Sequence, residues 1–124
     1  MRVMFVLIGL LMFTNAASAQ VAATGRPTVI YKTYSINPDC TASGEIVVRI
    51  IEPPEHGRVA VRRARLFPYF REGNSRSVCN RRRVPGVEVV YVSARGYVGP
   101  DRVGLDVIFP DGAARRGNIQ FTVR

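Results

Sequence analysis

Hydrophobic and polar residues alternate along most of the chain after residue 27, and no long segment carries apolar residues at helical spacing. Successive side chains of a β-strand point to opposite faces, so a period of two indicates strands that bury one face. Two segments show the pattern most clearly, 103–109 with Val103, Leu105, Val107 and Phe109 inward and 119–123 with Ile119, Phe121 and Val123 inward. Gly104 and Asp106 are expected to face outward.

Further strands are predicted at residues 28–34, 45–51, 58–66 and 87–93, separated by clusters of Pro, Gly, Asn and Asp that reverse the chain. Segment 45–51 is rich in β-branched residues and is expected at the centre of a sheet, and 87–93 is expected to be buried on both faces. A short seventh strand is predicted near 67–70, where Pro68 would restrict it to a sheet edge. About seven short strands with this spacing predict an all-β, immunoglobulin-like antiparallel sandwich over residues 28–124.

The first residues have the pattern of a signal peptide. Arg2 precedes the apolar run Val3–Phe13, and the small residues Ala17-Ser18-Ala19 form a cleavage site before Gln20. The sequence therefore predicts a signal-peptide helix at 1–19 that is removed, and a flexible N-terminal arm at 20–27. The alternative is an uncleaved membrane anchor, but the apolar run is shorter than the roughly 20 residues that span a bilayer.

The chain contains two cysteines, Cys40 and Cys79. In an exported chain of this size an even pair of cysteines predicts a disulfide. The bond would close a loop of about 40 residues and contribute about 4 kcal/mol through chain entropy. The alternative is a pair of reduced thiols, which is expected only if the chain is not exported. Export places the protein in the periplasm or outside the cell.

The chain is strongly basic, with a net charge of +9, and Lys32 is the single lysine among its 18 basic residues. Arginine can grip carboxylate, sulfate or phosphate with two parallel hydrogen bonds. The arginines form three clusters: Arg62, Arg63 and Arg65; Arg81, Arg82 and Arg83; and Arg115 and Arg116. We predict that they bind polyanions if they share one face. The alternative is a basic surface that only keeps the protein soluble.

Aromatic residues lie between the first two arginine clusters in the tetrapeptide Phe67-Pro68-Tyr69-Phe70. Two interpretations remain open for these side chains. They form either an exposed rim of a binding site or core packing beneath the disulfide loop, and the second is favoured.

Three parts of the chain resemble bacterial cadherin-like and immunoglobulin-like repeats. Pro54 followed by His56-Gly57-Arg58-Val59 is similar to their P-x-H/N-G-x-V entry. Residues 90–92 and 96–103 are similar to their Y-x-P…G-F/Y-x-G-x-D-x-F core, and Asp111-Gly112 with 119–123 resembles their final hairpin. The resemblance covers 53–124 and implies a β-sandwich module like those found in surface adhesins.

The chain departs from that family by having one module, two cysteines and few acidic residues. Some family members bind calcium, but Asp101 and Asp111 are isolated, whereas calcium requires six to eight oxygen ligands. Asp101 is instead expected to accept hydrogen bonds from turn amides. Gly96 and Gly99 bracket the tight loop that precedes it.

The sequence contains no recognisable catalytic or metal-binding motif. His56 is the only histidine, and one histidine with two paired cysteines cannot form a zinc site. The sequence lacks G-x-S-x-G and phosphate-binding glycine loops. We therefore predict a protein that is not an enzyme and has no cofactor or metal. A hydrolase using His56 and Glu55 is a weaker hypothesis that requires both side chains to line a concave pocket.

Two functions follow from these features. The first is a non-enzymatic exported binding or structural module of the bacterial periplasm or cell surface, which contacts acidic polysaccharide, lipopolysaccharide or anionic lipid through its arginines. The alternative is a small secreted inhibitor or accessory subunit of an exported enzyme, which inserts the loop 71–80 into a protein partner. No nucleic-acid recognition motif is present, and no transmembrane segment remains after signal cleavage.

Overall fold

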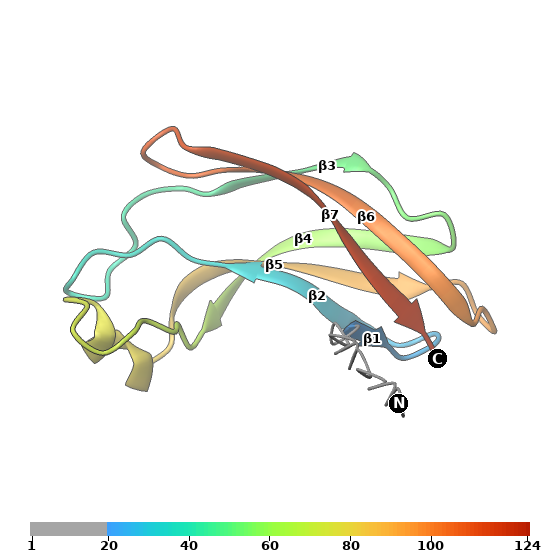
Figure 1. Cartoon of the computed structure of the whole chain (residues 1–124), viewed down its shortest axis with the longest axis horizontal. Helices are drawn as coiled ribbons and strands as arrows, with labels where there is room; N and C mark the ends of the chain where they lie inside the picture. The colour runs from blue at the N-terminus through green and yellow to red at the C-terminus, as the bar shows by residue number, and fades with distance from the viewer. Residues whose placement is uncertain (1–19) are drawn as a thin grey trace, which may run out of the picture.

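The computed structural model describes residues 20–124, and the predicted signal peptide at 1–19 lies outside the described residues. Seven strands form two sheets that face each other (Figure 1). The elements in chain order are β1 (Gln20–Ala22), β2 (Thr28–Thr33), β3 (Val47–Glu52), β4 (Gly57–Leu66), the 3-10 helix η1 (Ser77–Arg81), β5 (Val84–Ser93), β6 (Gly99–Ile108) and β7 (Ala114–Val123). The prediction of an all-β fold is confirmed.

One sheet has the order β1-β7-β6-β3 and the other has the order β2-β5-β4. The first strand pairs with the last strand in parallel, and the other strand pairs are antiparallel. The prediction of about seven strands in a two-sheet sandwich is confirmed. Of the residues 20–124, none belongs to a helix that is both long and apolar enough to cross a membrane.

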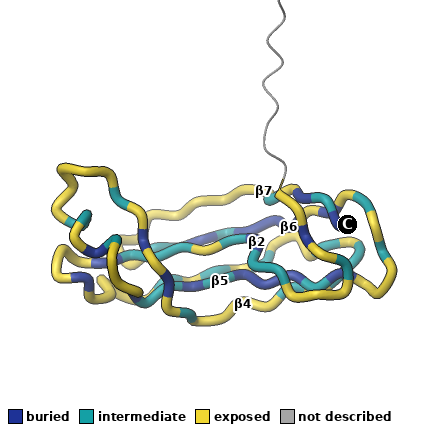
Figure 2. The backbone as a smooth tube through the Cα atoms, turned by 90° about the horizontal axis from the view of Figure 1, so that it is seen from below, coloured by how far each residue is buried: buried dark blue, intermediate teal, exposed yellow. Residues whose placement is uncertain are grey.

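The core lies between the sheets and follows the predicted alternation. Its fully or largely buried members are Ala22, Ile30, Val89, Tyr91, Val103, Leu105, Val107, Phe121 and Val123. Ile119 and Phe109 pack at its margin. Figure 2 shows that buried positions follow the strands, whereas the loops at both ends of the sandwich are mostly exposed. Burial at every second residue explains why these segments are strands.

One detail of the strand predictions is wrong. Strand β3 lies at the edge of its sheet, not at the centre. Its β-branched residues suggested a central strand, but only Val48 and Ile50 pack on the core, while Val47 and Ile51 are about 40% exposed. Gly104 faces outward as predicted, and the Glu52 side chain of the neighbouring strand covers it there.

No strand forms at residues 67–70, and β1 is the seventh strand. Pro68 has no N–H to donate, and the next two N–H groups are taken by side chains: Tyr69 donates to Tyr34 Oη and Phe70 donates to Asn80 Oδ1. The prediction of a flexible arm over 20–27 is wrong for its first residues. Gln20–Ala22 pairs with β7, and Ala22 is fully buried.

Candidate functional site

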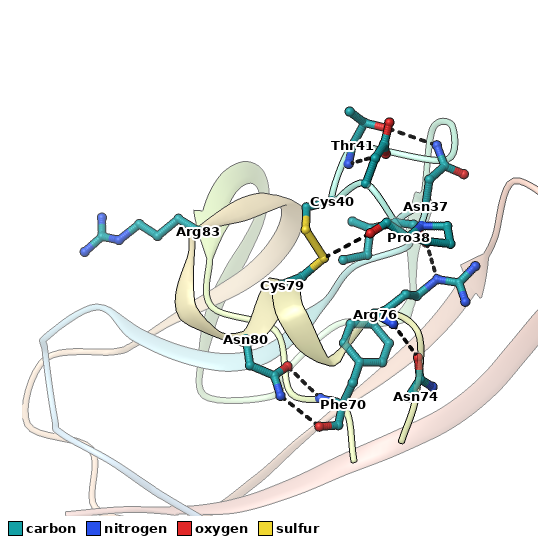
Figure 3. The surroundings of a disulfide bond; sticks show 12 residues. Asn37, Pro38, Cys40, Thr41, Phe70, Asn74, Arg76, Cys79, Asn80 and Arg83 are labelled. Atoms are coloured by element: carbon teal, nitrogen blue, oxygen red, sulfur yellow. Dashed lines mark hydrogen bonds between the residues drawn. A yellow bond between two sulfur atoms is a disulfide. The ribbon is translucent and has the colours of Figure 1, made fainter. Parts of the chain in front are cut away.

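The predicted disulfide between Cys40 and Cys79 is present (Figure 3). It joins the loop after β2 to η1 and lies in a second, smaller core with Ile36 and Val84. We call this part of the molecule the disulfide end, formed by residues 34–43, 66–83 and 109–115, and it occupies the left of Figure 1. The bond closes a loop of 39 residues, so it restricts the longest irregular segment of the chain.

Side chains hold the irregular segment 67–83 in one conformation. Asn80 makes two hydrogen bonds of 2.8 Å to the backbone of Phe70, one as donor and one as acceptor. The Tyr34 hydroxyl accepts a bond from the Tyr69 N–H and donates one to the Tyr69 carbonyl. Arg76 Nε donates to the Ile36 carbonyl at 2.7 Å. Because each bond links distant parts of the sequence, the disulfide end is a preorganised surface.

The three predicted arginine clusters do not form one continuous patch, because several members are paired with carboxylates. Arg62 bonds Glu88 at 2.9 Å on the three-stranded sheet, and Arg63 bonds Glu45 at 3.2 Å. Arg116 lies 3.7 Å from Asp106 on the other sheet. These arginines are partly neutralised and lie on different sheets, so they are weaker candidates for binding an external anion.

A different subset of the predicted residues does come together at the disulfide end. Arg65 donates to the backbone carbonyl of Arg83 at 2.9 Å, and the Arg83 guanidinium lies 5.5 Å from the centre of the Phe67 ring. Arg81 and Arg82 are exposed beside them. Within residues 20–124, no carboxylate forms an ion pair with any of these four arginines. Their role in binding anions stays a prediction.

The structure adds two arginines that the prediction omitted, Arg71 and Arg76. Segment 66–83 contains Arg71, Arg76, Arg81, Arg82 and Arg83 but only one acidic residue, Glu72. The prediction considered arginines that are adjacent or nearly so, and isolated ones were overlooked. Counting charge over the whole loop would have found them.

The tetrapeptide 67–70 divides between the two interpretations left open. Phe67 is 54% exposed and Tyr69 is 78% exposed, so these side chains form a rim. Pro68 is buried, and Phe70 packs on the disulfide core, where its ring meets Tyr34 edge to face at 5.6 Å. The aromatic rim therefore lies directly beside the unpaired arginines.

The opposite end of the sandwich is organised around a buried carboxylate. We call it the Asp101 end, formed by residues 23–27, 53–57 and 94–101. Asp101 accepts hydrogen bonds from the backbone N–H groups of Glu55, His56 and Arg102 and from the Tyr91 hydroxyl, all between 2.7 and 3.1 Å. The expectation that Asp101 binds turn amides is correct, but two of the amides belong to a distant turn.

This network shifts the pKa values of its two members. Burial alone would raise the pKa of Asp101, but the bonds from Tyr91 and the backbone N–H groups outweigh it and hold that pKa below its usual value. Burial and the nearby Asp101 charge both raise the pKa of Tyr91. Gly57 allows the close packing, since a Cβ there would lie 2.7 Å from the Tyr91 ring.

The geometry around His56 offers no positioned acid–base pair. Its ring stacks flat on Tyr97 at 3.9 Å, and Nε2 lies 3.8 Å from Glu55 Oε2, beyond hydrogen-bonding distance. A hollow of about 430 Å³ nearby is lined by Glu55 and Asp101 but not by His56. The Asp101 carboxylate accepts four hydrogen bonds from within the protein. It therefore acts as a structural joint that holds the turns of this end together.

Within the described chain, no group of three or more His, Cys, Asp or Glu side chains is arranged to hold a metal ion. No family model, curated protein or solved structure gives a significant match to this chain. The two ends of the sandwich are therefore the features of this protein that bear on its function.

Proposed function

We propose that this protein is an exported, non-enzymatic binding module of the bacterial periplasm or cell surface, whose disulfide end contacts anionic ligands of the cell envelope. The candidate ligands are acidic polysaccharide, lipopolysaccharide and anionic lipid. The observation that carries the proposal is the run of arginines in segment 66–83, which form no ion pairs within the described chain and lie on a rigid, disulfide-linked surface beside exposed aromatic rings.

Export is supported by the sequence pattern of residues 1–19 and by the disulfide. Disulfides persist in oxidising compartments and are common in small secreted domains. The role of a module is supported by the resemblance of residues 53–124 to cadherin-like and immunoglobulin-like repeats. Two of the three stretches that carry this resemblance meet at the Asp101 end, where Asp101 binds the backbone of Glu55 and His56.

The expected electrostatic attraction depends on the charges held at the disulfide end, and not on the net charge of the whole protein. Charges of one sign held on a fixed surface raise the local concentration of oppositely charged ligands, and this attraction weakens with salt. A mobile arginine loses side-chain freedom when it binds, whereas the backbone of segment 67–83 is already ordered by Asn80, Tyr34 and the disulfide. The disulfide end is therefore better suited to anions than the neutralised pairs on the sheets.

The proposal predicts that location of charge, and not charge alone, determines binding. We expect Arg81→Ser, Arg82→Ser and Arg83→Ser together to lower the salt concentration that elutes the protein from a polygalacturonate column. The control variant carries Arg26→Ser, Arg58→Ser and Arg95→Ser, which remove the same charge from exposed positions in the Asp101 end or next to it in sequence. Equal losses in the two variants would show nonspecific attraction and contradict the proposal.

A second candidate is a secreted inhibitor or accessory subunit, and one observation favours it. Three exposed large hydrophobic residues, Phe67, Tyr69 and Val78, lie on the same disulfide-linked segment, and Val78 is 62% exposed. Aromatic residues and arginines are enriched in protein interfaces. Capture of one protein from periplasmic extract in stoichiometric amount, lost on Tyr69→Ser, would favour this function over the first.

A further inference from the structure

A groove of about 340 Å³ runs between the disulfide core and the β6–β7 hairpin. Its walls come from segments far apart in the sequence. They include three aromatic rings and three charged side chains: Tyr34, Phe70, Phe109, Arg76, Asp111 and Arg115. We call it the Arg76–Arg115 groove. Its volume lies at the lower end of the range for small-molecule sites, roughly 300 to 1,000 Å³.

Arg76 is fixed in place on one side of this groove. Its Nε donates to the Ile36 carbonyl at 2.7 Å, and its backbone N–H donates to Asn74 Oδ1 at 2.8 Å. The residue is half-buried, and Figure 3 shows the guanidinium extended from the chain with its terminal nitrogens beyond the bond to Ile36. Among the described residues no carboxylate forms an ion pair with Arg76, so these nitrogens are free to bind a ligand.

Arg115 comes from the facing hairpin. Its guanidinium lies 5.7 Å from the centre of the Phe109 ring, a distance at which the ring attracts the cation. The hairpin is closed by bonds from the Phe109 N–H to the Ala113 carbonyl and from the Ala113 N–H to Asp111 Oδ1. The described chain supplies no ion pair to Arg115 either, in contrast to its neighbour Arg116.

Ring packing and hydrogen bonds fix the aromatic wall of the groove, as hydrogen bonds fix Arg76. Tyr34 and Phe70 pack edge to face at 5.6 Å, the Tyr34 hydroxyl is bound by Tyr69, and the Phe70 backbone is bound by Asn80. The π-face of an aromatic ring is electronegative and apolar, so it suits the C–H face of a sugar.

From this combination we infer that the groove binds a uronate, a sugar acid residue of an acidic polysaccharide. Two guanidiniums suit one carboxylate, because arginine binds carboxylates in a bidentate manner. Asp111 supplies an acceptor for a sugar hydroxyl. Its negative charge repels any anion, but it repels a singly charged carboxylate less than a doubly charged phosphate. The inference rests on the proposed function and narrows its ligand class from polyanions in general to carboxylated sugars.

The test uses the intact mature protein and a galacturonate trimer, with binding measured by titration calorimetry. The methyl-esterified trimer, which has lost its charges, and inorganic phosphate serve as comparison ligands. We expect the acid trimer to bind and the ester and phosphate to bind at least tenfold more weakly. Arg76→Gln and Arg115→Gln should each weaken binding of the acid trimer by about tenfold or more.

Arg76→Lys keeps the charge but loses the planar fork, so we expect it to recover little of the affinity lost in Arg76→Gln. The control Arg26→Ser, Arg58→Ser and Arg95→Ser removes three exposed charges outside both the groove and the disulfide end, and it should retain trimer binding. Unchanged circular dichroism and melting temperature will show that each variant is folded.

The outcomes separate this inference from the function on which it rests. Trimer binding that survives both glutamine variants, or phosphate binding as tight as the trimer, overturns the groove assignment. If the trimer does not bind while the polygalacturonate column still distinguishes the two triple variants, the groove is wrong and the proposed function stands. If the protein neither binds the trimer nor distinguishes those variants, both are wrong.

Discussion

The two ends of the sandwich are ordered by opposite means. The disulfide end holds an irregular segment with a covalent bond, and most of its arginines are exposed and form no ion pair within the described residues. The Asp101 end holds its turns with a buried anion whose lone pairs are taken by four donors. A charged group whose hydrogen bonds are all made within the protein has little capacity left to bind a ligand. Unpaired charged groups on a fixed backbone keep that capacity. The difference suggests a structural joint at one end and a binding surface at the other.

The largest expected effect comes from removing the covalent bond. Replacing Cys40 and Cys79 by alanine should lower the free energy of unfolding by about 4 kcal/mol, because the 39-residue loop gains freedom in the unfolded chain. Urea unfolding of the oxidised wild type and the double variant measures the difference. The same variant should also bind polygalacturonate less well, since segment 67–83 loses its anchor. A change below about 1 kcal/mol would contradict the view that this bond orders the disulfide end.

Removing the buried anion should cost somewhat less and should leave binding intact. Asp101→Asn replaces an acceptor of four bonds by a group with one acceptor oxygen, so buried donors lose their partners. We expect a loss of about 3 kcal/mol of unfolding free energy, as for hydrogen bonds to charged groups. Asp106→Asn is the matched control, because it removes only an ion pair with the exposed Arg116, worth less than about 1 kcal/mol.

If Asp101→Asn also reduced retention on polygalacturonate, the assignment of separate roles to the two ends would fail. Column retention of the folded variant therefore complements the urea titration. Unfolding free energies that are equal for the Asp101 and Asp106 variants would likewise show that the buried network contributes nothing special.

A smaller effect is expected in the dependence of stability on pH. The folded pKa of Asp101 lies below the usual value of 3.8, so the unfolded chain binds the proton more tightly. The stability that this group contributes is complete above the unfolded pKa and is lost as the pH falls below about 4 through the folded value. Urea unfolding between about pH 6 and pH 2 should show this loss, with a slope of at most about 1.4 kcal/mol per pH unit.

The Asp101→Asn variant supplies the control for that titration. Its stability should fall less steeply over the same range, because the titrating group is gone while the other carboxylates remain. Identical slopes for the variant and the wild type would assign the acid dependence to other groups.

Local patterns account for the parts of the fold that could be predicted. Segments such as 103–109 and 119–123 alternate because one face is buried, and that requirement acts on each residue separately. Two cysteines in a small chain that has the sequence pattern of a signal peptide were sufficient to predict the disulfide. The tetrapeptide 67–70 was predicted less well, because its backbone is satisfied by Tyr34 and Asn80, which a local pattern does not reveal.

The candidate site was harder to predict than the fold. The arginine-rich character of the chain was evident from the sequence. The sequence did not show that several clustered arginines form ion pairs with Glu45, Glu88 and Asp106, which makes them weaker candidates for binding an external anion. Arg76 stands alone in the sequence, and only the tertiary structure brings it into one groove with Asp111 and Arg115 of the β6–β7 hairpin.

By itself the sequence determined an all-β sandwich with one disulfide and a basic surface, because burial period, turn residues and charge are properties of single residues and their near neighbours. Only the tertiary structure decided that β1 pairs with β7, that Asp101 binds the turn at Glu55 and His56, 46 and 45 residues before it, and which arginines stay unpaired. Each of these depends on distance in space between residues that are far apart along the chain. The way in which the chain folds back on itself sets those distances, and the pattern of neighbouring side chains does not encode them.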